Sequence, residues 1–176
     1  SLCIVWALLT CLGYIQENGQ SVEPVRSVSS PTEVPTTSSA YSKIPENGGY
    51  YGYRFATFPN KERPSSVTVT TPRDGNYYCL VFADADKPQY KYFAVFVHPN
   101  SKVTVDVPAI DNLCLYITYG NTWYGYQQYF GSHGLWSTSD SVYDFGTYTY
   151  TLSLKEVAGG NWETEDIDAA QVPFLD

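Results

Sequence analysis

The chain has 176 residues, of which 16% are aromatic and 17 are tyrosines, and its formal net charge is −8 at pH 7. This length suits one domain with additional segments. Residues 50–160 carry eight basic and nine acidic side chains, so the net negative charge comes mainly from the two ends of the chain. The sequence contains no stripe of basic residues that could neutralise phosphates, and we therefore expect no nucleic-acid partner.

The first segment, SLCIVWALLTCLGYI (residues 1–15), is almost purely apolar and has neither an initiator Met nor a basic start. We therefore expect the chain to begin inside a longer protein. The segment suits a signal peptide or a truncated membrane anchor, because a complete span needs about 20 residues. The sequence Leu8-Leu9-Thr10-Cys11 is similar to a bacterial lipobox, which makes Cys11 a candidate lipidation site.

Residues 16–49 are rich in Ser, Thr, Pro and Glu and contain few large apolar side chains. Such a segment cannot bury enough surface to offset its chain entropy, which predicts a flexible linker. An apolar segment, a polar linker and an aromatic-rich domain follow one another in the order typical of surface-displayed proteins. We expect an extracytoplasmic protein that is secreted or is held at the cell membrane through residues 1–15 only.

Residues 50–160 contain short β-rich runs separated by turn residues. The runs are VTVTT (67–71), NYYCLVFADA (76–85), YKYFAVFVH (90–98), KVTVDVP (102–108), LCLYITYG (113–120) and FGTYTYTLSLKEV (145–157), with YYGYRFATF (50–58) as an edge strand. No stretch has a helical period over ten positions. The pattern predicts an all-β domain, an antiparallel two-sheet β-sandwich of immunoglobulin-like or transthyretin-like type, with a small β-barrel as the alternative.

Two cysteines, Cys79 and Cys114, lie in different expected strands. In an exported domain they are a candidate disulfide, and the alternative is that both are free, buried thiols that pack as small apolar groups. The sequence has no Cys-x-x-Cys motif and no His/Cys metal spacing, so we expect neither a metal site nor another cofactor.

The run GNTWYGYQQYFGSHGLW (residues 120–136) combines seven rings with four glycines and follows neither a helix nor a strand period. One hypothesis is an exposed platform that stacks on sugar faces or covers an apolar ligand. Its candidate ligand-binding residues are Trp123, Tyr124, Tyr126, Tyr129 and Trp136. The alternative is a loop that folds back on the sheets, with Trp123 and Phe130 buried and Tyr126, Tyr129 and Trp136 more accessible.

Residues 76–174 resemble an uncharacterised family of bacterial exported, envelope-associated domains. The motifs that carry the resemblance are KVTVDVP (102–108), TWYG (122–125), FG (130–131), STSDSVYDF (137–145), YTYTLSL (148–154) and GGNWETEDIDAAQVPF (159–174). Residues 110–112 depart from it, since a glycine turn is usual there, and so does GSHG (131–134), where the family is more acidic. The resemblance implies an exported β-fold, and the family has no assigned activity.

The tail, residues 161–176, contains five acidic residues and no basic one among Trp162, Ile167, Val172 and Phe174. These apolar residues suit docking along a strand edge or presentation to a partner. The alternative is a frayed terminus held to the domain surface by Phe174.

No constellation in the sequence indicates catalysis. His98 and His133 lie in different turns and lack a nearby nucleophile motif, and Asp74, Asp84 and Asp86 do not form a complete calcium loop. We therefore expect a non-catalytic binding or interaction module with a glycan or an envelope protein as its partner, of undetermined oligomeric state. A purely structural spacer domain within a larger envelope protein is the alternative.

Overall fold

Alternating and continuous apolar runs build strands through most of the domain. The computed structural model describes residues 41–55, 64–154 and 164–175, which all belong to one compact unit, Ser38–Asp176. In these residues the strands are β1 (Gly49–Gly52), β2 (Ser65–Thr70), β3 (Tyr77–Asp84), β4 (Lys91–Val97), β5 (Lys102–Val107), β6 (Leu113–Gly120), β7 (Leu135–Tyr143), β8 (Tyr150–Ser153) and β9 (Thr164–Ile167). Two short 3-10 turns are η1 (Gly131–His133) and η2 (Ala169–Gln171).

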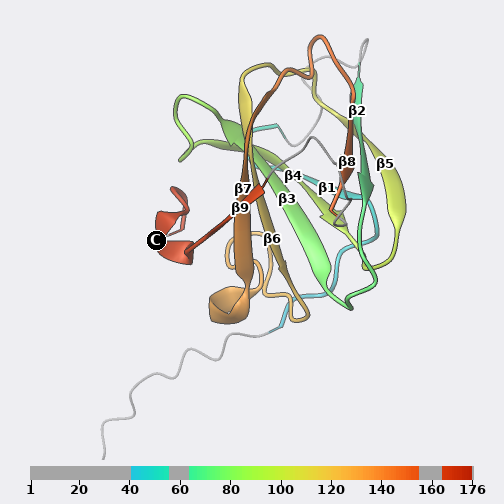
Figure 1. The fold of residues 1–176 in the computed structure, drawn as a ribbon, viewed down its shortest axis with the longest axis vertical. Coiled ribbons are helices and arrows are strands. Elements are labelled where there is room, and N and C mark those ends of the chain that lie inside the picture. Colours follow the sequence, from blue (N-terminus) through green and yellow to red (C-terminus); the bar gives the residue numbers. More distant parts are fainter. Residues whose placement is uncertain (1–40, 56–63, 155–163, 176) are drawn as a thin grey trace, which may run out of the picture. The chain divides into compact units, whose positions relative to one another are not determined.

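The strands form two sheets, as Figure 1 shows. The larger sheet has the order β1-β4-β3-β6-β7-β9 and the smaller has the order β5-β2-β8. Every pairing is antiparallel except that of β2 with β8, which is parallel. The predicted all-β, two-sheet sandwich is therefore confirmed, and the described strands do not close into the barrel that was its alternative.

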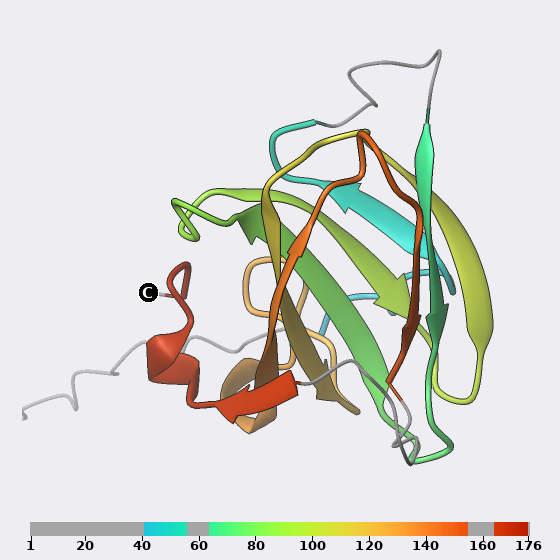
Figure 2. The same ribbon diagram turned by 45° about the horizontal axis from the view of Figure 1, so that its top comes forward.

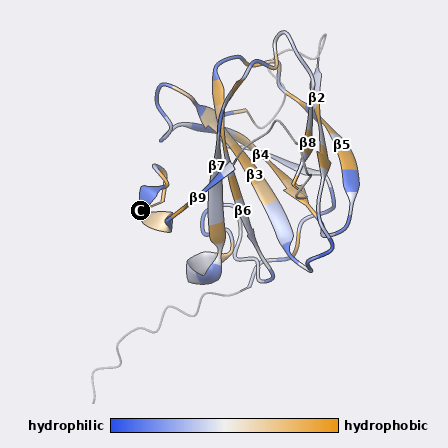
Figure 3. Ribbon diagram, viewed as in Figure 1, coloured by the Kyte–Doolittle hydropathy of each residue, from blue (hydrophilic) through white to orange (hydrophobic). Residues whose placement is uncertain are grey.

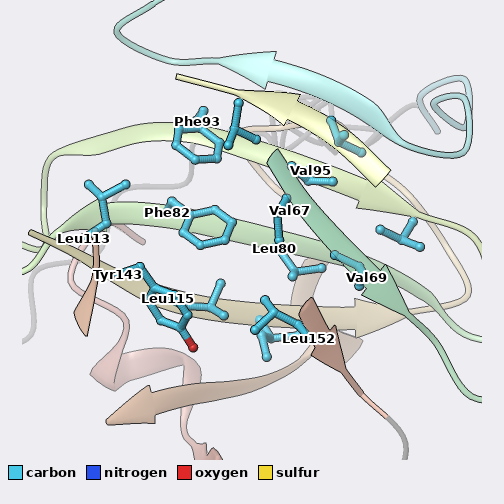
Figure 4. Packing of buried hydrophobic residues seen from close by; sticks show 14 of the residues in the cluster. Val67, Val69, Leu80, Phe82, Phe93, Val95, Leu113, Leu115, Tyr143 and Leu152 are labelled. Atoms are coloured by element: carbon cyan, nitrogen blue, oxygen red, sulfur yellow. The ribbon is translucent and has the colours of Figure 1, made fainter. Parts of the chain in front are cut away.

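A hydrophobic core fills the space between the two sheets. Its side chains come from β3, β4, β6 and β7 on one side and from β2, β5 and β8 on the other, as Figure 4 shows for ten labelled residues. Phe82 lies at its centre, with its ring centroid 4.7 Å from that of Phe93 and 5.3 Å from that of Phe145. Val103, Val105 and Val107 alternate along β5, share one of its faces and pack here.

The outer face of the larger sheet carries a second apolar cluster. Cys79 and Val81 on β3 and Ala94 and Phe96 on β4 point away from the first core and are fully buried. Strands β3 and β4 are thus covered on both faces, which explains why their sequences are continuously apolar, whereas β2 and β5 alternate (Figure 3).

Two strands were missed by the sequence prediction. The expected runs include no strand between residues 120 and 145, but β7 occupies Leu135–Tyr143, and β9 lies within the expected tail. The middle of β7 is a run of Ser, Thr and Asp, and such a polar cluster is typical of a loop in sequence. Ser139 fits the core because the Tyr143 hydroxyl donates a hydrogen bond of 3.0 Å to its Oγ.

The domain begins earlier than the expected boundary at residue 50. In the described part of the expected linker, the Ser42 amide donates to the Trp123 carbonyl at 3.1 Å and the Gly48 amide donates to the Phe96 carbonyl at 2.8 Å. Residues 41–49 therefore belong to the fold. The apolar segment 1–15 with Cys11, the linker up to residue 40 and Trp162 lie outside the described residues.

Cys79 and Cys114 are both free thiols, so the disulfide hypothesis is not supported; Cys79 is buried, as the alternative expects, whereas Cys114 is only half-buried. Cys114 pairs across the sheet with Ala83, four positions along β3 from Cys79. That offset separates the two Cα atoms by about 13 Å, whereas a disulfide needs less than about 7 Å. Burial raises the pKa of Cys79, and burial also raises that of Cys114, to about 11, so both are protonated at neutral pH.

Serine substitutions of the two cysteines are expected to lower the free energy of unfolding by different amounts, because the two thiols have different environments. Cys79→Ser is expected to lower the free energy of unfolding by about 1–3 kcal/mol, because a hydroxyl would be buried in an apolar cluster. Cys114→Ser is expected to change it by less than about 0.5 kcal/mol, since the Cys114 thiol already faces the Ala83 carbonyl oxygen at 3.5 Å and is partly exposed. Urea titrations of both variants provide the measurement, and equal losses would contradict the assignment.

Candidate functional site: the Tyr124 surface

The aromatic loop, residues 121–134 between β6 and β7, folds back over the outer face of the larger sheet. Trp123 packs edge-on against Phe96 at a centroid distance of 4.8 Å and against Phe130 at 5.1 Å. Tyr129 packs edge-on against Trp136 at 5.2 Å. The loop thus forms a third layer of the domain. It covers the sheet face on which Cys79 and its neighbours would otherwise be exposed.

The backbone of the loop is held in a tight reversal. Gly125 and Gly131 have positive φ values of 101° and 65°, which glycine adopts without steric cost. Tyr129 also has a positive φ, 52°, which costs a bulky residue about 1–2 kcal/mol. Its amide donates to the Gly125 carbonyl at 2.6 Å, and its carbonyl accepts from the Tyr124 amide at 2.7 Å. These bonds, together with burial of the Tyr129 ring, hold the strained residue in place.

A chain of hydrogen bonds runs under the loop from Lys91. The Tyr53 hydroxyl lies 3.0 Å from the Tyr126 carbonyl oxygen and 2.7 Å from the Tyr129 hydroxyl. Because the Tyr53 proton is given to the carbonyl, Tyr129 donates to Tyr53, and Lys91 Nζ donates to Tyr129 at 3.2 Å. Burial, with a further contribution from the nearby Cys79, raises the pKa of both tyrosines, so both stay neutral.

The Lys91 ammonium group is also surrounded by rings. Its Nζ lies 4.4 Å from the ring centroid of Tyr53, 5.0 Å from that of Phe174 and 5.4 Å from that of Tyr129. These distances suit cation–π attraction. The Lys91 ammonium group therefore contacts the segment that follows β1, the aromatic loop and the C-terminal segment.

The structure separates the five candidate ligand-binding residues into two groups. Trp123, Tyr129 and Trp136 are only 2%, 1% and 4% exposed, so they pack the outer layer and offer no ligand surface. Burial of Trp123 was expected, but the prediction that Tyr129 and Trp136 are more accessible is wrong. Tyr126 is half-buried, and its ring stacks on that of Tyr51 at 4.1 Å.

Tyr124 is the candidate that borders open space. It is half-buried and lines two neighbouring hollows. The first, here named the Tyr124 hollow, has a volume of about 400 Å³ and lies where the end of β6 meets η1 and the start of β7. Its lining residues are Asn76, Tyr119, Gly120, Asn121, Thr122, Tyr124, Phe130, His133 and Leu135.

The second hollow is wider and more open, with a volume of about 590 Å³. Side chains of the aromatic loop line one wall and η2 with Leu175 lines the other; these two segments lie close together in Figure 2. The Tyr41 ring, 77% exposed, lies 5.5 Å from the Tyr124 ring and extends the aromatic surface. Sequence reasoning missed Tyr41, Asn76 and Tyr119 because they come from segments outside the loop.

The two histidines have different environments. His98 Nε2 lies 2.8 Å from the Pro45 carbonyl oxygen, and the His98 backbone amide donates to Asn47 Oδ1. His98 therefore holds the segment before β1 against the end of β4. His133 is exposed and lines the Tyr124 hollow. The two lie in different connections, as expected from the sequence, since His98 follows β4 and His133 lies in η1. Among the described residues, no group of three His, Cys, Asp or Glu side chains could hold a metal ion.

The aspartates do not converge on one site. Asp74 precedes β3 and accepts hydrogen bonds from Tyr78 and Asn76, whereas Asp84 ends β3 and accepts from the Asp86 and Lys87 amides. Partial burial opposes ionisation of Asp74, but the bonds from Tyr78 and Asn76 prevail and lower its pKa. These carboxylates stabilise turns at opposite ends of one strand.

The fold and the outer layer define an all-β sandwich with an aromatic cover and an open polar hollow at Tyr124. No helix in the described ranges has the length and apolarity needed to cross a membrane. No protein-family model, curated protein or solved structure matches the chain. The resemblance to exported, envelope-associated domains therefore stays a prediction.

Proposed function

We propose that the domain is a non-catalytic binding module that takes a neutral saccharide at the Tyr124 hollow. The observation that carries the proposal is the position of Tyr124, whose partly exposed ring borders both hollows and lies beside the exposed ring of Tyr41. Flat rings stack on sugar faces, and amides or hydroxyls around them give direction. Asn76, Asn121 and Thr122 are placed around the first hollow to do this.

The charges around the hollow favour a neutral ligand over an anionic one. No Lys or Arg is among the described residues that line either hollow. Burial raises the pKa of Tyr119, and the nearby carboxylates of Asp166 and Asp74 raise it further. Negative charge beside the hollow would repel phosphate, sulfate or uronate groups.

The expected location outside the cytoplasm is part of this proposal. The location is inferred from the apolar segment 1–15 and the polar linker that follows it. A domain displayed at the cell surface would meet the glycans of the cell envelope. The test is to express the full-length natural protein and to label intact cells with a reagent that cannot cross the membrane. Labelling only after lysis would contradict an exposed location.

A structural spacer is the second candidate function. Burial of Trp123, Tyr129, Phe130 and Trp136 supports it, because these rings stabilise the domain instead of forming a ligand platform. A spacer needs no ligand. It would leave the Tyr124 hollow as ordinary surface.

A glycan array with neutral, basic and anionic members distinguishes the two functions. The unmodified protein is expected to retain neutral saccharides, and Tyr124→Ala is expected to weaken retention about tenfold or more, because a central aromatic contact would be lost. The melting temperature should change little, since Tyr124 is not in the buried cluster.

Tyr148→Ala is the matched control, because Tyr148 is 60% exposed and does not line either hollow. It should bind as the unmodified protein does. Absence of retention by the unmodified protein on every member of the array would favour the spacer. Equal binding by Tyr124→Ala would place the ligand elsewhere.

A further inference from the structure

The C-terminal segment, residues 164–175, lies on the free edge of β7. Strand β9 pairs there in antiparallel register, with Trp136 opposite Ile167, Thr138 opposite Glu165 and Ser139 opposite Thr164. Three of the four β9 residues are exposed and Ile167 is half-buried. The strand is therefore held mainly by main-chain hydrogen bonds, with little side-chain burial.

Two apolar side chains beyond β9 anchor the segment. Val172 is 2% exposed in the outer cluster. The Phe174 ring lies 5.2 Å from the Tyr116 ring and 6.0 Å from the Trp136 ring, with Lys91 Nζ 5.0 Å from its centroid. Together β7 and these contacts form an acceptor site for an extended strand followed by two apolar anchors.

The turn between the strand and the anchors is stabilised within the segment itself. The Asp168 side chain accepts from the Ala170 amide at 2.9 Å, and the Gln171 side chain accepts from the Asp168 amide at 2.8 Å. This capping box depends on no residue of the rest of the domain. The turn is therefore held by the segment's own residues, which lowers the entropy cost of docking.

An open β7 edge would need an occupant. Loss of the segment would leave the main chain of Trp136–Ser139 without partners on that side and would expose the Trp136 ring. Such an edge is a template for strand addition.

We infer that the β7 edge is an exchange site, which accepts residues 164–175 of a second copy of this chain in place of its own. The second copy presents the same register, anchors and capping box, so the acceptor site binds both with the same contacts. Nine residues separate Leu154 from Thr164 and span up to about 30 Å when extended, enough for a neighbouring molecule. This inference is independent of the proposed saccharide site.

Simple stacking of the two outer edges is disfavoured. Glu165 and Asp166 are exposed on β9 and Asp168 follows it. Like charges brought together across a β9–β9 contact would repel each other. Exchange avoids this contact, because each β9 lies against a β7 that carries one acidic residue, Asp140, beyond the paired positions.

Cross-linking in the full chain tests the exchange. A Thr138→Cys chain and a Glu165→Cys chain, with different affinity tags, are mixed at high concentration, incubated below the melting temperature and oxidised. A disulfide that joins the two substituted positions of different chains is the expected product, identified by mass spectrometry of the linked peptides. A mixture of Thr138→Cys with Asp166→Cys is the off-register control, since Asp166 pairs with Ser137.

The inference predicts several-fold more cross-linked product from the in-register mixture than from the off-register one. Equal amounts from the two mixtures would overturn it. A second measurement needs no cysteine: unmodified chains with two tags are mixed and purified on one tag. Recovery of the second tag with the first, increasing with protein concentration, supports exchange, whereas a strictly monomeric protein at every concentration overturns it.

Discussion

Trp123→Ala is expected to lower the free energy of unfolding by about 3–5 kcal/mol. The indole ring is 2% exposed and packs against Phe96, Tyr126, Tyr129 and Phe130. Its removal would leave a cavity at the centre of the outer layer, and the surrounding rings relax only in part. Urea unfolding with an unchanged denaturant slope would measure the loss.

Tyr124→Ala is the matched control, since Tyr124 is the next residue of the same loop but is only half-buried. Its substitution is expected to cost less than about 1.5 kcal/mol. If the two variants lose the same stability, the loop does not act as the buried third layer described above. If Trp123→Ala loses almost none, the outer cluster contributes nothing to folding.

Alkaline pH is expected to unfold the domain steeply. Burial raises the pKa values of Tyr53, Tyr129 and Cys79 in the folded state above their ordinary values of 10.0 for tyrosine and 9.0 for cysteine. The neutral forms are therefore the stable ones in the fold. The stabilisation is complete below the unfolded values and is lost as pH rises above them.

The size of the effect follows from linkage. Above pH 10 each of these three groups costs about 1.4 kcal/mol of stability per pH unit, because it ionises only in the unfolded chain. The three together lower the free energy of unfolding by about 4 kcal/mol per pH unit at most. Circular dichroism and tyrosinate absorbance, recorded together over the alkaline range, measure the unfolding and the ionisation.

Tyr129→Phe separates this linkage from general alkaline damage. The variant loses the bonds to Tyr53 and Lys91, so its stability at neutral pH should fall by about 1 kcal/mol. Above pH 10, the free energy of unfolding of the variant should fall less steeply with pH, because one of the three titrating groups is absent. Ionisation of all 17 tyrosines near pH 10 in a chain that stays folded would contradict the buried hydroxyl network.

The fold class was predictable because most strands carry their own signal. The β5 sequence KVTVDV alternates, and its three valines all pack on the core between the sheets. Strand β7 carries no such signal, since the polar cluster of Ser, Thr and Asp over residues 137–141 is typical of a loop. It forms because Thr138 Oγ1 donates to the Leu115 carbonyl and Ser139 accepts from Tyr143, contacts that only the tertiary structure supplies.

The candidate site was predictable only in part. The loop was recognisable from its density of rings and glycines, and the expected burial of Trp123 and Phe130 is observed. Which tyrosines face inward depends on Lys91 and Tyr53, which lie far away in the sequence. The continuous apolar sequences of β3 and β4 were the missed signal, because a strand that is apolar on both sides needs cover on both faces.

The parallel pairing of β2 with β8 has a consequence for biosynthesis. The Ser65 hydroxyl donates to the Tyr148 carbonyl across 83 residues of sequence, and the whole larger sheet except β1 and β9 is encoded between these positions. Most of the protein must leave the ribosome before the smaller sheet can close. Such distant contacts slow folding, so the smaller sheet is expected to close after the hairpins of the larger sheet have formed.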